Sequence, residues 1–318
     1  METEQEVIKA EQTAEITAPV KEPAHKSYLL PASILISAIL ITGTWVYTTG
    51  LKSSAVSHPT LGTAPLAANF EKAVMPEEGV ILPVQWGDLG TQLIASGVLN
   101  GARFASILEE RGIFGPETEK LLGGTSNENI TITRENANVL LNLLWAFGLG
   151  NKNQILETGP MADPQYGGPG NFASTGGWTL AQGDPMSHYS KHEFVKLTSS
   201  QQALVEQVSK NIYRPCCGNA TYFPDCNHGM AMLGLLEIMA SQGATEDEMY
   251  RAGLAVNAYW FPDTYLAIAR YLNGRGISWA KADPKEMLGA NFSSASGYSR
   301  ILKEIEPVSP QGGGGCGV

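Results

Sequence analysis

The chain has 318 residues, of which 43% are hydrophobic and 16% are charged, and its formal net charge is −10. This length suffices for a membrane segment plus one sizeable domain, or for two small domains. An acidic chain with no run of lysines or arginines lacks the basic patch of a nucleic-acid-binding surface, so we expect no nucleic-acid partner. Four cysteines are too few for a disulfide-dense scaffold of this size.

The N-terminal part predicts a disordered segment followed by a membrane anchor. Residues 1–27 are rich in Glu, Ala and Thr and contain too few large apolar residues to offset the entropy lost on ordering. Residues 28–50 carry no charge, and about 20 apolar residues at about 1.5 Å rise cross a hydrocarbon core of about 30 Å. A cleaved signal peptide is the alternative, but no clear small-x-small cleavage site is present. We therefore predict a single transmembrane helix at 28–50.

The cations around this span predict its orientation. Lys21 and Lys26 precede it, whereas Lys52 is the nearest cation after it. The positive-inside rule then places the N-terminus in the cytoplasm and the main domain outside it. The membrane is accordingly an expected partner, and residues 51–76 read as a linker of small residues.

Residues 77–306 predict an all-α globular domain, irregular in arrangement and with long Gly/Pro-rich loops. Apolar residues recur at helical spacing, and few stretches alternate with a period of two. The expected helices cover residues 87–96, 102–111, 116–122, 134–147, 198–213, 227–241, 246–259, 264–272, 284–288 and 298–305. A flexible Gly-rich tail, residues 307–318, follows the domain and carries the fourth cysteine, Cys316.

Three features refine this prediction. The helix at 227–241 is apolar almost all round, so we expect it to be central and buried. Thr198 and Thr245 each begin a capping box, with Gln or Glu three residues later. Residues 151–185 show no periodicity and contain many glycines, which is typical of a functional loop or lid.

The candidate site begins in the stretch from residue 215 to residue 229. It holds Cys216, Cys217, Cys226 and His228, three of the four cysteines and one of the five histidines. Thiolates and imidazoles are the ligands that hold zinc, copper and iron. Cys226 and His228 flank the start of a predicted helix, whose free N–H groups and positive dipole end lower the pKa of the Cys226 thiol.

The spacing of these residues matches no standard motif. C-C-x8-C-x-H differs from the paired C-x2-4-C of zinc fingers, from the C-x-x-C-H of haem attachment and from the C-x-x-C of thioredoxin-like proteins. Because Cys216 and Cys217 are adjacent, we expect one of them to bind metal while the other packs or forms a disulfide. The prediction of a metal site therefore rests on the local density of ligands.

A second pair of candidate ligands lies upstream. His188 and His192 are four residues apart, so on a helix they share one face. We predict that this pair and the cysteine stretch meet around one metal ion. The glutamate of the H-E-x-x-H motif is absent from between the two histidines, which argues against a hydrolytic zinc enzyme. The alternative is a pair of surface histidines.

These features predict a membrane-anchored extracytoplasmic protein that binds copper, zinc or iron and acts in metal handling or redox chemistry. Two alternatives remain open at this point. Cys216, Cys217 and Cys226 could serve a thiol–disulfide redox protein. Alternatively, Cys226 could form a structural disulfide with Cys216 or Cys217 in an interaction module without catalysis. Whether the protein is an enzyme, and which metal it holds, are not decided by the sequence.

Overall fold

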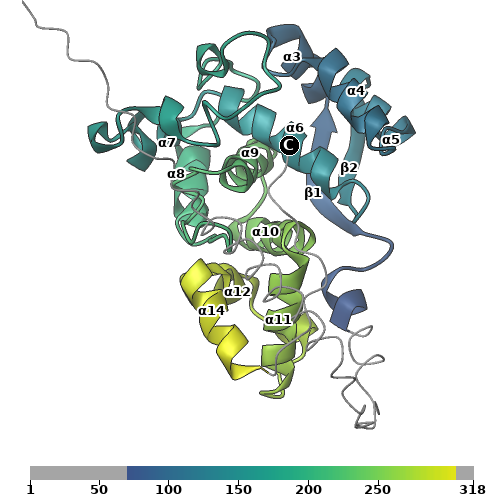
Figure 1. Ribbon diagram of the computed structural model, residues 1–318, viewed down its shortest axis with the longest axis vertical. Coiled ribbons are helices and arrows are strands. Elements are labelled where there is room, and N and C mark those ends of the chain that lie inside the picture. The colour runs from purple at the N-terminus through teal and green to yellow at the C-terminus, as the bar shows by residue number, and fades with distance from the viewer. Residues whose placement is uncertain (1–69, 306–318) are drawn as a thin grey trace, which may run out of the picture. The chain divides into compact units, whose positions relative to one another are not determined.

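The computed structural model describes residues 70–305, and helices make up most of them (Figure 1). The longer helices are α3 Leu89–Ser96, α4 Gly101–Glu110, α5 Pro116–Gly123, α6 Ala137–Gly150, α8 Ser199–Ser209, α9 Asn227–Ser241, α10 Glu246–Trp260, α11 Pro262–Asn273 and α14 Ala295–Glu304. The shorter ones are α7 Gln154–Thr158, α12 Pro284–Leu288, α13 Ala290–Ser293 and the 3₁₀ turns η1 Pro160–Ala162, η2 Pro164–Tyr166, η3 Pro169–Asn171, η4 Pro185–Ser187 and η5 Trp279–Lys281. The strands are β1 Val80–Gly87 and β2 Ser126–Ile132.

The all-α prediction is wrong, because β1 and β2 pair as a two-stranded antiparallel sheet. In β1, the buried residues Leu82, Val84 and Trp86 alternate with residues that are more exposed. In β2, Ile130 and Ile132 are buried against the core. This alternation is typical of a half-buried strand, but in each strand it spans only two or three apolar positions.

The prediction of a membrane anchor also requires correction. The proposed span at residues 28–50 lies outside the described residues, as do segments 1–27 and 307–318 and most of the linker. Within residues 70–305, no helix has both the length and the apolar character needed to cross a bilayer. The structure therefore does not support a single-pass membrane protein with a cytoplasmic N-terminus and an extracytoplasmic domain, nor the membrane as a partner.

Helix α9 packs against α6 and runs in the same direction, and the pair forms the centre of the core (Figure 1). Every α9 residue from 228 to 240 is buried, which confirms the predicted central helix. Glycines allow the two backbones to approach closely: a Cβ on Gly234 would lie 2.6 Å from the carbonyl oxygen of Leu144 and 3.0 Å from the amide nitrogen of Gly148. The crossing point of α6 and α9 thus has room only for hydrogen atoms.

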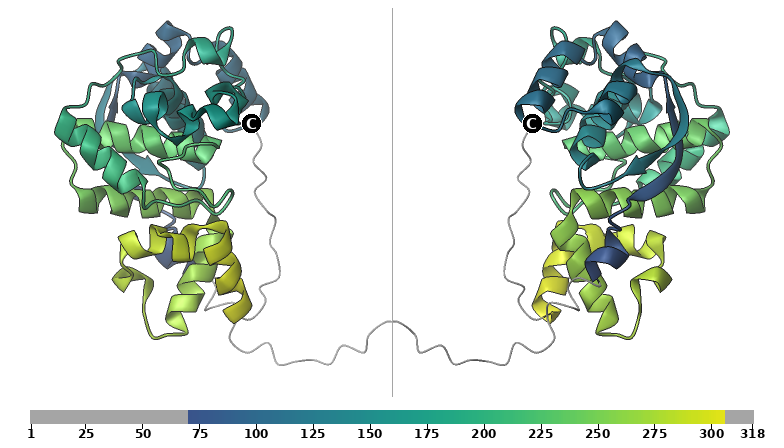
Figure 2. Two further views of the ribbon diagram at one scale, coloured as in Figure 1. Left: turned by 90° about the vertical axis from the view of Figure 1, so that its left-hand side faces the viewer. Right: turned by 90° about the vertical axis from the view of Figure 1, so that its right-hand side faces the viewer.

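The remaining helices surround this pair. Helices α10 to α14 gather toward one end of the described part of the chain, whereas α3 to α5 lie toward the other (Figure 2). Helix α10 contacts α6, α8, α9, α11 and α12, so it connects the central pair to the C-terminal helices. The capping boxes at Thr198 and Thr245 are both present, as predicted.

The irregular stretch after α7 is fastened to the core by two tryptophans. The indole Nε1 of Trp178 donates to the carbonyl oxygen of Val98 at 2.8 Å, and Trp178 is only 1% exposed. The indole Nε1 of Trp145, on α6, donates to the carbonyl oxygen of Ser174 at 2.7 Å. The absence of regular helix or strand predicted for most of 151–185 is confirmed, and these contacts hold the loop in place.

One carboxyl group is buried in the core beside the α6–α9 crossing. Glu237, on α9, is fully buried; its Oε2 accepts a hydrogen bond from Asn151 Nδ2 at 2.5 Å, and its Oε1 has no partner within residues 70–305. Burial raises the pKa of Glu237 well above its usual value, and the hydrogen bond from Asn151 only partly opposes this. The folded protein therefore favours the protonated, neutral acid.

We expect Gly234→Ala to destabilise the fold even though alanine favours helix. The added methyl group must push α6 and α9 apart, and overpacking of this kind typically costs about 1–3 kcal/mol. The higher helix propensity of alanine returns only about 1 kcal/mol. Urea unfolding measures the difference. Gly123→Ala is the matched control, because Gly123 also lies in a helix and its added Cβ would meet nothing within 4 Å. Equal stability changes for the two variants would contradict the close approach.

We expect Glu237→Gln to gain stability relative to the unmodified chain as pH rises. A raised pKa means that the folded state holds the proton more tightly than the unfolded state, so the stability this group contributes is complete below about pH 4.3 and is lost as pH rises toward the folded pKa. The gap between the two unfolding free energies should change by up to about 1.4 kcal/mol per pH unit. Urea titrations at pH 5 and pH 8 measure it, with exposed Glu119→Gln as the control; parallel pH curves would contradict the prediction.

Candidate metal centre

A tight turn carries Cys216 and Cys217 to the start of α9. An isolated bridge between Tyr213 and Ala220 closes the turn, and the amide of Gly218 donates to the carbonyl oxygen of Arg214 at 2.9 Å. Gly218 has a φ of 76°, a left-handed conformation that glycine adopts without strain. Cys226 is the N-cap residue of α9, so the third thiol lies at the end of that helix.

The three sulfur atoms form a nearly equilateral triangle. Sγ of Cys216 lies 3.7 Å from Sγ of Cys217 and 3.6 Å from Sγ of Cys226, and the remaining side of the triangle is 3.8 Å. All three are free thiols. A tetrahedral centre with metal–sulfur bonds of about 2.3 Å places its sulfurs about 3.8 Å apart. The triangle therefore has the dimensions of three ligands of one metal ion, and it includes both adjacent cysteines.

His228 supplies a fourth donor beside this triangle. A ring nitrogen of His228 and the sulfurs of Cys216 and Cys226 all lie within 4.8 Å of one another. The Nδ1 atom is buried and has no hydrogen-bond partner among the described residues. The ring is held by Phe261 and Trp260, with ring centroids 4.5 Å and 5.6 Å away. Neither ring nitrogen of His228 has a hydrogen-bond partner among the described residues that would compete with a metal ion, so the ring is free to act as a ligand.

Arg214 lies behind the sulfurs, and its side chain is fully buried. Its Nη2 donates to Sγ of Cys217 at 3.2 Å, to the carbonyl oxygen of Phe223 at 3.0 Å and to Oδ1 of Asp225 at 2.6 Å. Burial disfavours its charge, but attraction to the thiolates of Cys226 and Cys217 and to Asp225 outweighs this and raises its pKa. A permanent positive charge therefore faces the thiols from the protein side.

Asp225 orients this arginine rather than completing the metal site. Asp225, Cys217 and Cys226 also form a group with ligand spacing. However, one carboxylate oxygen of Asp225 is paired with Arg214, and the other accepts from Asn219 Nδ2 at 2.8 Å. The ring nitrogen of His228 has no such competing partner, so it is the better fourth ligand.

The thiols differ in their readiness to ionise. Hydrogen bonds from Cys216 and Cys217 stabilise the Cys226 thiolate, and together with Arg214 they lower its pKa. Donating those hydrogen bonds in turn raises the pKa of Cys216. The lowered pKa predicted for Cys226 is confirmed in direction, although the neighbouring thiols are its main cause. Cys226 therefore ionises more readily than Cys216.

His188 and His192 lie together elsewhere in the fold. No helix carries them: Ser190, between them, has a φ of 52° and folds the chain so that the two rings stack. His188 Nδ1 lies 3.2 Å from His192 Nε2, and His188 Nε2 lies 3.0 Å from the carbonyl oxygen of Gln182. Neither belongs to a cluster with the metal-ligand spacing found among residues 70–305. The structure therefore does not bring this pair to the cysteines.

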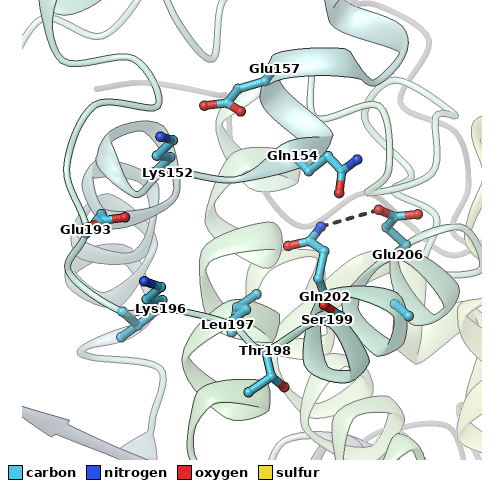
Figure 3. Close-up of a pocket in the computed structure, with 12 residues that line it drawn as sticks. Lys152, Gln154, Glu157, Glu193, Lys196, Leu197, Thr198, Ser199, Gln202 and Glu206 are labelled. Atoms are coloured by element: carbon cyan, nitrogen blue, oxygen red, sulfur yellow. Dashed lines mark hydrogen bonds between the residues drawn. The ribbon is translucent and has the colours of Figure 1, made fainter.

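A pocket of about 440 Å³ lies between α7 and α8 (Figure 3). Charges of both signs line it, among them Lys152, Lys196, Glu157 and Glu206. None of the predicted ligands lies in its wall. Its charged side chains are of both signs and it contains no cysteine or histidine, so it does not compete with the cysteine cluster as the functional site.

The sequence prediction missed the residues that support the ligands. Arg214 directly precedes the cysteine stretch, and a cation next to cysteines is a known way of stabilising thiolates. Gly229 was also overlooked: a Cβ there would lie 2.6 Å from Cζ of Arg214. An arginine before the cysteines and a glycine in the first turn of the helix are the signals that could have indicated this arrangement.

Comparison of the chain with models of known protein families, with curated proteins and with solved structures finds no match.

We expect Gly229→Ala to weaken metal binding while the fold persists. The added methyl group displaces the guanidinium of Arg214 from the thiols, and losing such support around a metal typically lowers affinity about 10- to 100-fold. Competition with a chromophoric zinc chelator measures the affinity. Gly123→Ala serves as the control for a helical glycine without neighbours, and an unchanged zinc affinity in Gly229→Ala would contradict the supporting role of Arg214.

Proposed function

We propose that this protein binds one divalent metal ion, zinc by preference, through Cys216, Cys217, Cys226 and His228. The carrying observation is the sulfur triangle with sides of 3.6 to 3.8 Å, which has the spacing of ligands around a tetrahedral ion. A ring nitrogen of His228 lies within 4.8 Å of two of these sulfurs, those of Cys216 and Cys226. A Cys₃His set of this kind is a common environment of zinc.

The charges around the cluster favour a divalent ion over copper(I). Three thiolates and a divalent ion carry a net charge of −1, and Arg214 and Asp225 cancel each other. With a monovalent ion the same site would hold −2 beside a fully buried side chain, and buried charge without compensation is costly. Zinc has no preferred geometry of its own and accepts the tetrahedral arrangement. Iron(II) or copper(I) in the purified protein, in place of zinc, would contradict this choice of metal.

The ion joins two segments that hydrogen bonds of Asp225 with Arg214 and Asn219 already link. It connects the turn at Cys216 and Cys217 to the first turn of α9, where Cys226 and His228 lie. Because α9 is the central helix, the metal anchors the cysteine turn to the most rigid part of the fold. Metal binding then releases thiol protons and adds to the stability of the folded chain.

We expect the purified full chain to contain close to one equivalent of zinc. Cys226→Ser should lose most of the metal, because it removes one of the three sulfurs of the triangle and a hydroxyl is a poor ligand for zinc. Mass spectrometry of the acid-released metal gives the stoichiometry. Substitution with cobalt(II) gives thiolate charge-transfer and tetrahedral ligand-field absorption bands that report on the geometry.

Cys316→Ser is the matched control, since Cys316 is the one cysteine that is not among the proposed ligands. It should leave the zinc content unchanged. A folded protein that contains no metal and takes up none from a zinc-buffered solution would overturn the proposal. Full zinc content in Cys226→Ser would place the metal elsewhere.

A further inference from the structure

The metal centre opens onto a cavity with an aromatic wall. Cys216 and His228 line a cavity of about 430 Å³. Its other walls come from α6, the end of α10, α11 and α14, and they include Leu141, Tyr259, Trp260, Phe261 and Tyr298. This volume is many times the about 30 Å³ that one water molecule occupies in the liquid. A small organic molecule therefore fits against the two ligands that face the cavity.

The three thiols are unequally accessible from this side. Cys216 is exposed, whereas Cys217 and Cys226 are half-buried. Cys217 also receives a hydrogen bond from the buried Arg214, which holds it on the protein side. A molecule that enters the cavity meets the sulfur of Cys216 first. The sulfur of Cys226 lies 3.6 Å behind it, close enough to form a bond after a small movement.

From this geometry we propose that the centre is a redox switch for organic hydroperoxides, which enter the aromatic cavity, oxidise Cys216 and Cys226 to a disulfide and release the metal. This inference rests on the metal site proposed above. It assigns that site a substrate class and a consequence: the metal leaves because two of its four ligands are consumed.

The reaction balances with one hydroperoxide for each disulfide. The thiolate of Cys216 attacks the terminal oxygen of the hydroperoxide; the O–O bond breaks, and the alkoxide leaves as an alcohol after taking a proton from solvent. The sulfenic acid formed on Cys216 is then attacked by the thiolate of Cys226, and hydroxide leaves as water after a second protonation. Two thiolates lose two electrons in total, and the peroxide bond gains them.

The cavity wall decides which peroxide is favoured. A hydroperoxide with an apolar group can bury that group against the aromatic rings, which favours its binding, whereas hydrogen peroxide has no apolar group to bury. The rims also offer polar groups, among them exposed Asn138 on α6, which suit the polar end of a small amphiphile. A hydroperoxide with a compact aromatic group therefore fits this site better than hydrogen peroxide does.

The test treats the zinc-loaded full chain carrying Cys316→Ser with cumene hydroperoxide or with hydrogen peroxide. Zinc release is followed with a chromophoric chelator, and the disulfide is located by mass spectrometry of the unreduced peptides. We expect zinc release and loss of two thiols to proceed together, with a Cys216–Cys226 disulfide as the product. Each rate is divided by the rate of the same peroxide with glutathione, which corrects for intrinsic reactivity. After this correction, cumene hydroperoxide should react about tenfold faster than hydrogen peroxide. A tenfold advantage corresponds to the burial of about 60 Å² of apolar surface.

Asn138→Trp fills the mouth of the cavity without touching a ligand. It should keep its zinc and its rate with hydrogen peroxide but lose the preference for cumene hydroperoxide. If that variant fails to hold zinc, two measurements on the chain with Asn138 intact still test the inference. They are the ratio of the rates with the two peroxides and the identity of the cysteines in the disulfide.

Three results would overturn the inference: zinc retained under cumene hydroperoxide, a disulfide that omits Cys216, or equal normalised rates for the two peroxides. A chain that holds no zinc before treatment overturns the metal site itself, and is thereby distinguished from a zinc-bound chain that ignores the oxidant.

Discussion

The buried guanidinium of Arg214 is the interaction on which the rest of the site depends. Its donors reach a thiol, a backbone carbonyl and a carboxylate, and it packs directly on Gly229 in the first turn of α9. A charge with no exposure is tolerated only where opposite charges surround it. The thiolates and Asp225 supply these charges. Conversely, three thiols less than 4 Å apart can lose their protons together only near compensating cations, which are Arg214 and the proposed metal.

The position of this cluster follows from the packing of the core. Helix α9 is buried along nearly its whole length because glycines let it approach α6 closely, so its N-terminus is fixed by the same contacts that fix the core. Cys226 and His228 lie at that end. The metal ligands on the helix are therefore held rigidly, whereas Cys216 and Cys217 come from a turn that the metal itself would complete. The ligands on α9, Cys226 and His228, are thus fixed by the core, whereas Cys216 and Cys217 in the turn are the ones that can move and react.

The separation of the two histidines from the cysteines also has a structural cause. The left-handed turn at Ser190 pairs His188 with His192, and the carbonyl oxygen of Gln182 fixes the ring of His188. His192 also pairs with Asn151 in an isolated parallel bridge, and the side chain of Asn151 donates a hydrogen bond to the buried Glu237. These groups form their own polar region. Of this region and the cysteine cluster, only the cluster has the spacing of a metal site among residues 70–305.

The sequence by itself determined most of the helices, because apolar residues at helical spacing and the caps at Thr198 and Thr245 are local signals. It also pointed to Cys216, Cys217, Cys226 and His228, since ligand density is visible along the chain. It missed the sheet, because the alternation in each strand covers only two or three apolar positions, and proline, here Pro83 in β1, normally argues against a strand. The membrane anchor predicted from composition found no support in the described residues.

Only the tertiary structure decided which predicted ligands meet. Sequence spacing relates residues within one helix or turn, but Arg214 meets Gly229 and Cys216 meets Cys226 because the turn folds back onto the start of α9. The same holds for the cavity, whose walls come from helices more than 100 residues apart along the chain. Contacts of this kind depend on how the helices pack, and the order of residues along a chain does not record that packing.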